Sequence, residues 1–110
     1  MSAGETMVEH HLGPVEQIPL GEGREFVVDG RRVAVFRLRS GAVAATQAEC
    51  PHRAGPLADG TLGMDSVVCP LHNWRFALRD GASQQGDCDI AVHPIRLDGS
   101  GGLLLTLEGT

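Results

Sequence analysis

Aromatic residues are scarce in this chain: among 110 residues there is no tyrosine, one tryptophan and three phenylalanines. So few rings leave little for stacking on nucleic acid bases. The formal net charge of −5 at pH 7 also argues against nucleic acid, because a protein that binds phosphates needs a basic surface. A mildly acidic surface suits docking onto a basic patch of a protein partner instead. We therefore expect no nucleic acid partner.

Long apolar runs are also absent, and none approaches the length of a membrane span. Residues Met1 to Leu12 contain no basic residue other than histidine and no apolar segment of the kind found in secretory signals. These features predict a cytoplasmic protein without a membrane partner. The length is that of one domain.

Cysteine is limited to three residues, an odd number that does not indicate a disulfide framework. Cys88 has no histidine nearby at ligand spacing, and we interpret it as a small loop or core residue. Sequence motifs for binding nucleotides are missing too, and so is an iron site of two histidines and one carboxylate. Any chemical step on a substrate is therefore expected to occur on another polypeptide.

Short apolar stretches separated by turn dipeptides predict an all-β fold. No segment keeps a helical apolar period over three turns. The turn dipeptides can supply the positive φ of tight hairpins. We expect a flexible tail over residues 1–13 and a single domain over residues 14–110. The predicted strands are Glu25–Val28, Arg32–Leu38, Ala42–Gln47, Ser66–Cys69, Trp74–Leu78, Ile90–Leu97 and Leu103–Leu107, and the turns are Asp29-Gly30, Ser40-Gly41, Asp80-Gly81 and Asp98-Gly99.

Two short segments in the middle of the chain each combine one cysteine with one histidine: Cys50-Pro-His52 and Cys69-Pro-Leu-His72. Two cysteines with two histidines can hold a [2Fe–2S] cluster in which histidines replace the cysteines on one iron. The same donors suit tetrahedral zinc, although zinc sites more often take both cysteines from one loop. A catalytic thiol activated by histidine would leave the second pair unexplained.

Four flanking residues are expected to shape this site. Pro56 and Pro70 restrict the backbone of the two loops and so limit motion around a metal. Trp74 and Phe76 are interpreted mainly as packing beside the site, and Trp74 as part of a docking surface as well.

The run from Cys50 to Leu57, followed by Gly60 and by Cys69-Pro-Leu-His-Asn-Trp-Arg-Phe76, resembles the Rieske [2Fe–2S] family. The resemblance covers roughly residues 14–108. It implies a small antiparallel β-sandwich or barrel with a cluster-binding subdomain formed by two loops. It also implies that Cys50 and Cys69 bind one iron, that His52 and His72 bind the other through Nδ1, and that the protein transfers electrons.

Two departures from the respiratory members of this family bear on the reduction potential. Those members carry an extra cysteine in each loop, joined as a disulfide, where this chain has Gly55 and Leu71. They also have a serine and a tyrosine near the cluster, where Asn73 and Trp74 stand here. Fewer hydrogen bonds to the sulfurs stabilise the reduced cluster less. The resemblance thus predicts a potential in the lower part of the Rieske range of about −150 to +300 mV.

Asn73 and Trp74 make the second loop most similar to that of the small subunit of assimilatory NAD(P)H-dependent nitrite reductase. This resemblance implies a larger partner subunit that carries sirohaem and flavin. One alternative is a Rieske-type ferredoxin that delivers electrons from a flavin reductase to a ring-hydroxylating dioxygenase. Two others are a zinc-stabilised binding module and a structural small subunit whose cluster lies off the electron path.

Overall fold

A computed structural model describes residues 7–51, 55–71, 73–84 and 88–108. Within these residues there are strands and two short 3₁₀ helices but no α-helix. No helix in this part of the chain is long and apolar enough to cross a membrane. The elements are β1 (Met7–Pro14), η1 (Val15–Gln17), β2 (Glu22–Val28), β3 (Arg31–Arg37), β4 (Val43–Gln47), η2 (Leu57–Asp59), β5 (Thr61–Leu62), β6 (Ser66–Val68), β7 (Arg75–Ala77), β8 (Val92–His93), β9 (Ile95–Leu97) and β10 (Gly102–Glu108).

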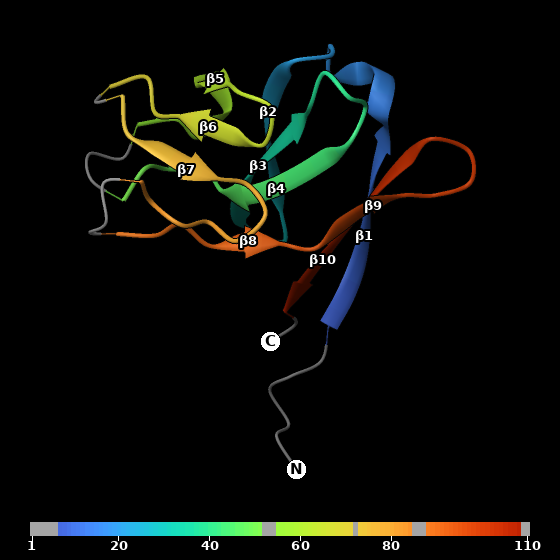
Figure 1. Cartoon of the computed structure of the whole chain (residues 1–110). Helices are drawn as coiled ribbons and strands as arrows, with labels where there is room; N and C mark the ends of the chain where they lie inside the picture. The colour runs from blue at the N-terminus through green and yellow to red at the C-terminus, as the bar shows by residue number, and fades with distance from the viewer. Residues whose placement is uncertain (1–6, 52–54, 72, 85–87, 109–110) are drawn as a thin grey trace.

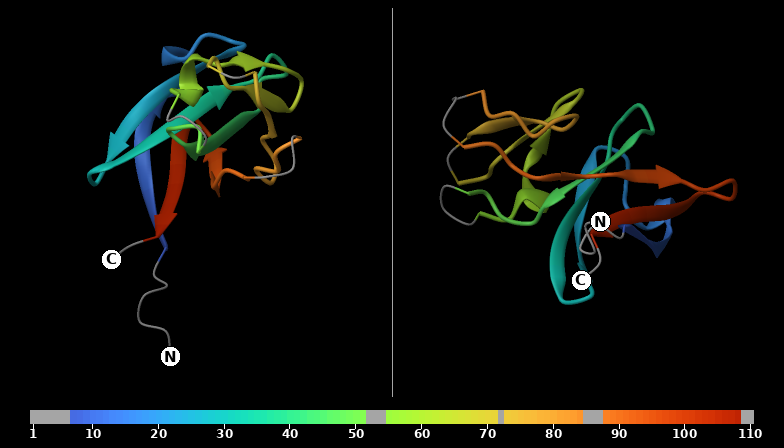
Figure 2. Two further views of the ribbon diagram at one scale, coloured as in Figure 1. Left: turned by 90° about the vertical axis from the view of Figure 1, so that its left-hand side faces the viewer. Right: turned by 90° about the horizontal axis from the view of Figure 1, so that it is seen from below.

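The strands form three antiparallel sheets (Figure 1). One sheet has the order β1-β10-β9, the second β2-β3-β4-β8 and the third β5-β6-β7. Figure 2 shows the small third sheet on one side of the molecule and the β1–β10 pair on the other. The prediction of an all-β fold is confirmed.

The two central strands of the second sheet, β3 and β4, are buried on both faces, because they lie between two hydrophobic cores. Along β3, Val33 and Val35 enter the core shared with β10, whereas Ala34 and Phe36 enter the core shared with the third sheet. Successive strand residues point to opposite faces, so a strand buried on both faces needs an unbroken apolar run. The sequence Val33-Ala-Val-Phe36 is such a run, and its side chains are at most 1% exposed.

Three of the four predicted turn dipeptides adopt positive φ. Asp29 (φ 51°) and Gly30 (φ 77°) form a two-residue hairpin loop with positive φ at both positions, as a type I′ turn requires. Gly41 and Gly81 also have positive φ. The predicted turn at Asp98-Gly99 is present, but its positive φ lies two residues later, at Gly101 (φ 87°). Asp98 caps this loop by accepting the N–H groups of Ser100 and Gly102.

The prediction of a flexible tail through residue 13 was wrong for residues 7–13. They belong to β1, which pairs with β10 from Met7 opposite Glu108 to Pro14 opposite Gly102. Most side chains of β1 are exposed, so its sequence lacks the apolar alternation that marks a half-buried strand. The backbone pairing with β10 orders this segment instead. Residues 1–6 lie outside the described residues.

Candidate metal centre

The first predicted ligand loop leaves the end of β4 and returns at η2. The Cys50 N–H donates to the carbonyl oxygen of Gly55 at 2.8 Å, and the Leu57 N–H donates to that of Ala48 at 2.9 Å. Glu49 and Pro56 form an isolated antiparallel bridge between these two bonds. The loop is therefore a narrow excursion closed at its base, with Cys50 at the point where it opens.

The second loop connects β6 to β7 and is closed in the same way. The Cys69 N–H donates to the carbonyl oxygen of Trp74 at 2.7 Å, and the Asn73 N–H donates to that of Cys69 at 3.0 Å. Asn73 has φ 58°, a conformation that asparagine and glycine accept more readily than other residues. In both loops the cysteine N–H bonds to the residue five positions later.

The two loops lie against each other at Gly55. A Cβ at this glycine would lie 3.1 Å from Cys69 Sγ and 3.0 Å from Leu71 Cγ. The absence of a side chain at Gly55 thus lets the first loop approach the cysteine of the second. The two loops therefore meet at Gly55 and Cys69, as a shared metal centre would require.

Both cysteines lie at the inner side of this junction. Cys50 is 1% exposed and Cys69 is fully buried, and both belong to the core that contains Phe36, Leu57 and Phe76. Buried thiolates need compensating positive charge, which two ferric ions would supply. With two thiolates and two neutral imidazoles the oxidised [2Fe–2S] cluster is uncharged, and the reduced cluster carries one negative charge. The cysteine positions and their burial fit such a cluster.

The histidines His52 and His72 lie outside the described residues, so their predicted ligand role stays a prediction. Among the described residues no three Cys, His, Asp or Glu side chains gather into a metal-binding group. Cys88 is exposed.

The flanking residues differ in their exposure. Phe76 is fully buried in β7, whereas Trp74 is half-buried and packs against the same core. Pro56 is half-buried at the start of η2, and Pro70 is exposed. Phe76 therefore has no surface to offer a partner, whereas Trp74 has some.

Comparison with known proteins decides between iron–sulfur and zinc. A family model, the Rieske [2Fe–2S] domain, matches residues 9–95. The chain belongs to the Rieske [2Fe–2S] domain family. A Rieske domain implies a Rieske cluster, and when bound the cluster supplies a centre that accepts and donates one electron. The match starts inside β1, so the family domain includes residues that belong to this strand.

Two curated relatives of this Rieske chain differ greatly in length. The chain is 35% identical over 88 residues to the biphenyl dioxygenase ferredoxin subunit of Pseudomonas sp. (strain KKS102), covering 77% of this chain and 80% of that protein. It is 36% identical over 67 residues to the 3-ketosteroid-9-alpha-monooxygenase oxygenase component of Mycolicibacterium smegmatis (strain ATCC 700084 / mc(2)155). That match covers 61% of this chain and 18% of the oxygenase component, so the chain spans less than a fifth of that relative's length.

Among solved structures, a candidate NADH-dependent nitrite reductase small subunit from Mycobacterium tuberculosis superposes with a TM-score of 0.88 at 24% identity. The superposition covers 96% of this chain and all of the other. This likeness confirms the Rieske fold.

Sequence reasoning missed a group of polar residues beside the first loop. Arg32 donates to the side-chain carboxylate of Glu49, and Gln47 donates to the backbone carbonyl of Glu49. Their positions in the sequence carry no motif, because Arg32 reaches Glu49 only after β3 and β4 have paired.

Proposed function

We propose that this Rieske protein is a carrier of the ferredoxin type, which takes single electrons from a flavin reductase and passes them to the oxygenase component of a ring-hydroxylating dioxygenase. Electron transfer through the Rieske cluster follows from the family, whereas the two partners are the proposal. The observation that carries it is the 35% identity to the biphenyl dioxygenase ferredoxin subunit across 80% of that protein. Residence in the cytoplasm is part of this proposal.

The conformation of Asn73 removes one of the reasons for preferring a nitrite reductase small subunit. Dioxygenase ferredoxins usually have glycine at this position, and in this respect Asn73 resembles the nitrite reductase group instead. With φ 58°, however, the position calls for a residue that tolerates the left-handed region, which both glycine and asparagine do. Asparagine here therefore satisfies the same backbone requirement as glycine and does not separate the two groups.

The small subunit of an NAD(P)H-dependent nitrite reductase is the second candidate. It is supported by the TM-score of 0.88 over 96% of this chain and the whole of the matched protein. Trp74, half-buried beside the second loop, belongs to the segment that resembles this group. The partner would then be a larger sirohaem- and flavin-containing subunit.

Electron delivery tests these partners directly. The full chain, purified anaerobically with its cluster, is mixed with NADH and either the flavin reductase and oxygenase of a biphenyl dioxygenase system or the large subunit of an NADH nitrite reductase. We expect turnover of the aromatic substrate that depends on this chain and is lost in Cys69→Ser. Nitrite reduction that depends on the chain, without aromatic turnover, would contradict the ferredoxin proposal and support the second candidate.

A further inference from the structure

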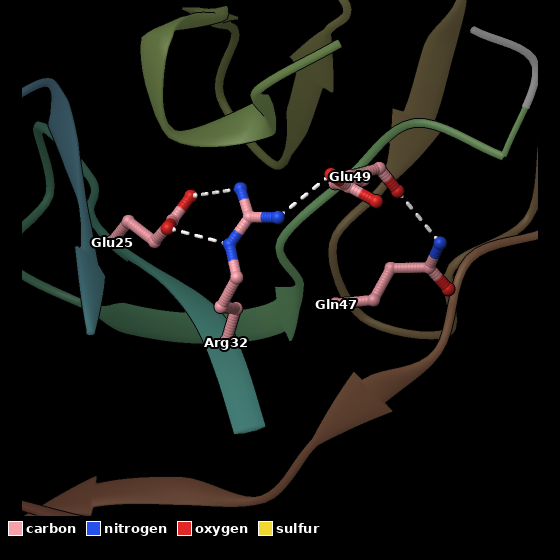
Figure 3. Close-up of polar contacts among 4 residues, drawn as sticks. All are labelled: Glu25, Arg32, Gln47 and Glu49. Carbon is pink, nitrogen blue, oxygen red and sulfur yellow. Dashed lines mark hydrogen bonds and ion pairs between the residues drawn. The ribbon is translucent and has the colours of Figure 1, made fainter. Parts of the chain in front are cut away.

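Polar side chains from β3 and β4 converge on Glu49, the residue before Cys50 (Figure 3). Arg32 Nη1 of β3 donates to Glu49 Oε2 at 2.7 Å. The side-chain amide of Gln47, the last residue of β4, donates to the backbone carbonyl of Glu49 at 2.7 Å. Both the side chain and the main chain of Glu49 are thus held by the second sheet.

The carbonyl of Glu49 and the N–H of Cys50 belong to one peptide group, which is planar. Gln47 binds the carbonyl end of this group, and the carbonyl oxygen of Gly55 accepts from its N–H end at 2.8 Å. A planar group held at both ends keeps one orientation. Since the peptide leads directly into Cys50, its orientation restricts the direction in which the Cys50 side chain leaves the backbone.

Gln47 is itself fixed by the segment before β8. Its backbone N–H donates to the carbonyl oxygen of Ala91 at 3.0 Å, and its side-chain oxygen accepts the Ala91 N–H at 2.8 Å. Reversing the side-chain amide would place donors against the Ala91 N–H and an acceptor against the Glu49 carbonyl. Only one amide orientation satisfies both bonds, so Gln47 is a rigid link.

Arg32 is held as firmly from the other side. Its guanidinium makes two hydrogen bonds to the Glu25 carboxylate of β2, Nε to Oε2 at 2.9 Å and Nη2 to Oε1 at 3.1 Å. The hydrogen bond from Arg32 lowers the pKa of Glu25, and the bonds to Glu25 and Glu49 raise the pKa of Arg32. The side chains of Arg32 and Glu49 are 47% and 46% exposed, and such exposed pairs add little stability. The role of the Arg32–Glu49 pair is therefore to hold the Glu49 side chain in place.

We propose that Gln47, supported by Arg32, is a positioning residue of the metal centre: it fixes the peptide that precedes Cys50 and thereby the thiolate that binds iron. The inference rests on the ligand role proposed for Cys50. Gln47 acts through Glu49 and the backbone. Residues that orient metal ligands in this way typically change metal affinity by about 10- to 100-fold when they are replaced.

Two substitutions of Gln47 separate its two bonds. Gln47→Leu removes both, whereas Gln47→Glu keeps an acceptor for the Ala91 N–H but loses the donor to Glu49. Gln17→Leu is a matched control, because the Gln17 amide also donates to a backbone carbonyl, that of Leu12 in β1, at 2.8 Å. The measurements are the rate at which the cluster is lost to a chelator and the EPR spectrum of the dithionite-reduced protein.

We expect Gln47→Leu and Gln47→Glu to lose the cluster about 10- to 100-fold faster than the unmodified protein, with broadened or shifted EPR lines. Gln17→Leu should keep the unmodified rate and spectrum. Loss rates and spectra of both Gln47 variants within twofold of the unmodified protein would overturn the proposal. If Gln47→Leu does not fold, Gln47→Glu and Arg32→Leu are measured instead. Faster cluster loss in both is expected, and loss rates within twofold of the unmodified protein in both would overturn the proposal.

These measurements need no electron-transfer partner. A negative result with the dioxygenase and nitrite reductase systems would therefore leave the positioning role intact. Equally, unchanged cluster loss in the Gln47 variants would leave the carrier function intact. Full retention of the cluster by Cys50→Ser would overturn the ligand role on which the inference rests.

Discussion

At the scale of single residues, Gly60 shows how closely the chain approaches the second ligand loop. A Cβ at Gly60 would lie 2.3 Å from the carbonyl oxygen of Val68 and 2.9 Å from a methyl carbon of Val67. Any residue can adopt its φ of −73°, so glycine is required here because a side chain would not fit, and not because of the backbone conformation. The carbonyl of Val68 belongs to the peptide that leads into Cys69, so any shift of this carbonyl moves a predicted ligand.

We predict that Gly60→Ala lowers the free energy of unfolding by about 1 to 3 kcal/mol, the usual effect of crowding a packed site, and reduces the amount of cluster bound. Gly99→Ala is the matched control, because a Cβ there meets nothing within 4 Å and its φ is not positive. Thermal unfolding followed by circular dichroism, together with iron content, measures both effects. A Gly60→Ala protein as stable as Gly99→Ala would contradict the packing described.

The candidate site could be predicted only in part at this scale. The Cys–His spacing indicated Cys50 and Cys69 because a metal donor set is a local sequence pattern. Gln47 and Arg32 carry no such pattern. Their roles depend on hydrogen bonds to Ala91 and Glu25, which exist only once separate strands have come together.

At the scale of elements, the two ligand loops are neighbours through Gly55 and Leu71. A Cβ at Gly55 would lie 3.0 Å from Leu71 Cγ and 3.1 Å from Leu71 Cδ1. These are the positions where, by resemblance, respiratory Rieske proteins join their loops through a disulfide. The structure thus places the two positions close enough for such a link, which needs Cβ atoms about 3.5–4.5 Å apart.

We predict that the double variant Gly55→Cys/Leu71→Cys forms an intramolecular disulfide on mild oxidation. Mass spectrometry of the denatured protein after thiol labelling should show two fewer labelled cysteines than in the reduced variant. As a control, Gly99→Cys/Leu71→Cys pairs the same loop with a distant turn and should label fully. Full labelling of both oxidised variants would show that the loops do not meet as described.

The strands differed in how well the sequence predicted them. β3 was predicted because its apolar run reflects burial on both faces, and β10 because Leu103, Leu105 and Leu107 alternate into one core. β1 and β5 were missed. β1 is largely exposed and β5 has only two residues. Both form strands through backbone pairing, with β10 and β6 respectively, and backbone pairing cannot be predicted from local composition.

At the scale of the whole molecule, the small third sheet carries the second ligand loop and the other two sheets form the rest of the fold. The first and second sheets enclose one core. The other core lies between the second sheet and the third sheet, which carries the second loop. In Figure 1 the ends of β1 and β10 that lead to the termini lie away from the small sheet of β5–β7. The family and its cluster could be predicted from two motifs. The partner could not, because Asn73 has φ 58°, which asparagine and glycine both tolerate, and so does not distinguish the two candidate groups.

The most direct test of the central claim is nitrogen hyperfine spectroscopy of the dithionite-reduced full chain, purified anaerobically and compared with His72→Ser. We predict about two iron atoms and two sulfides per chain, and two histidine nitrogens coupled to the cluster, with the two-nitrogen pattern lost in His72→Ser. Bound zinc in place of iron and sulfide, or a cluster without coupled nitrogens, would contradict the assignment of Cys50, His52, Cys69 and His72 as the ligands.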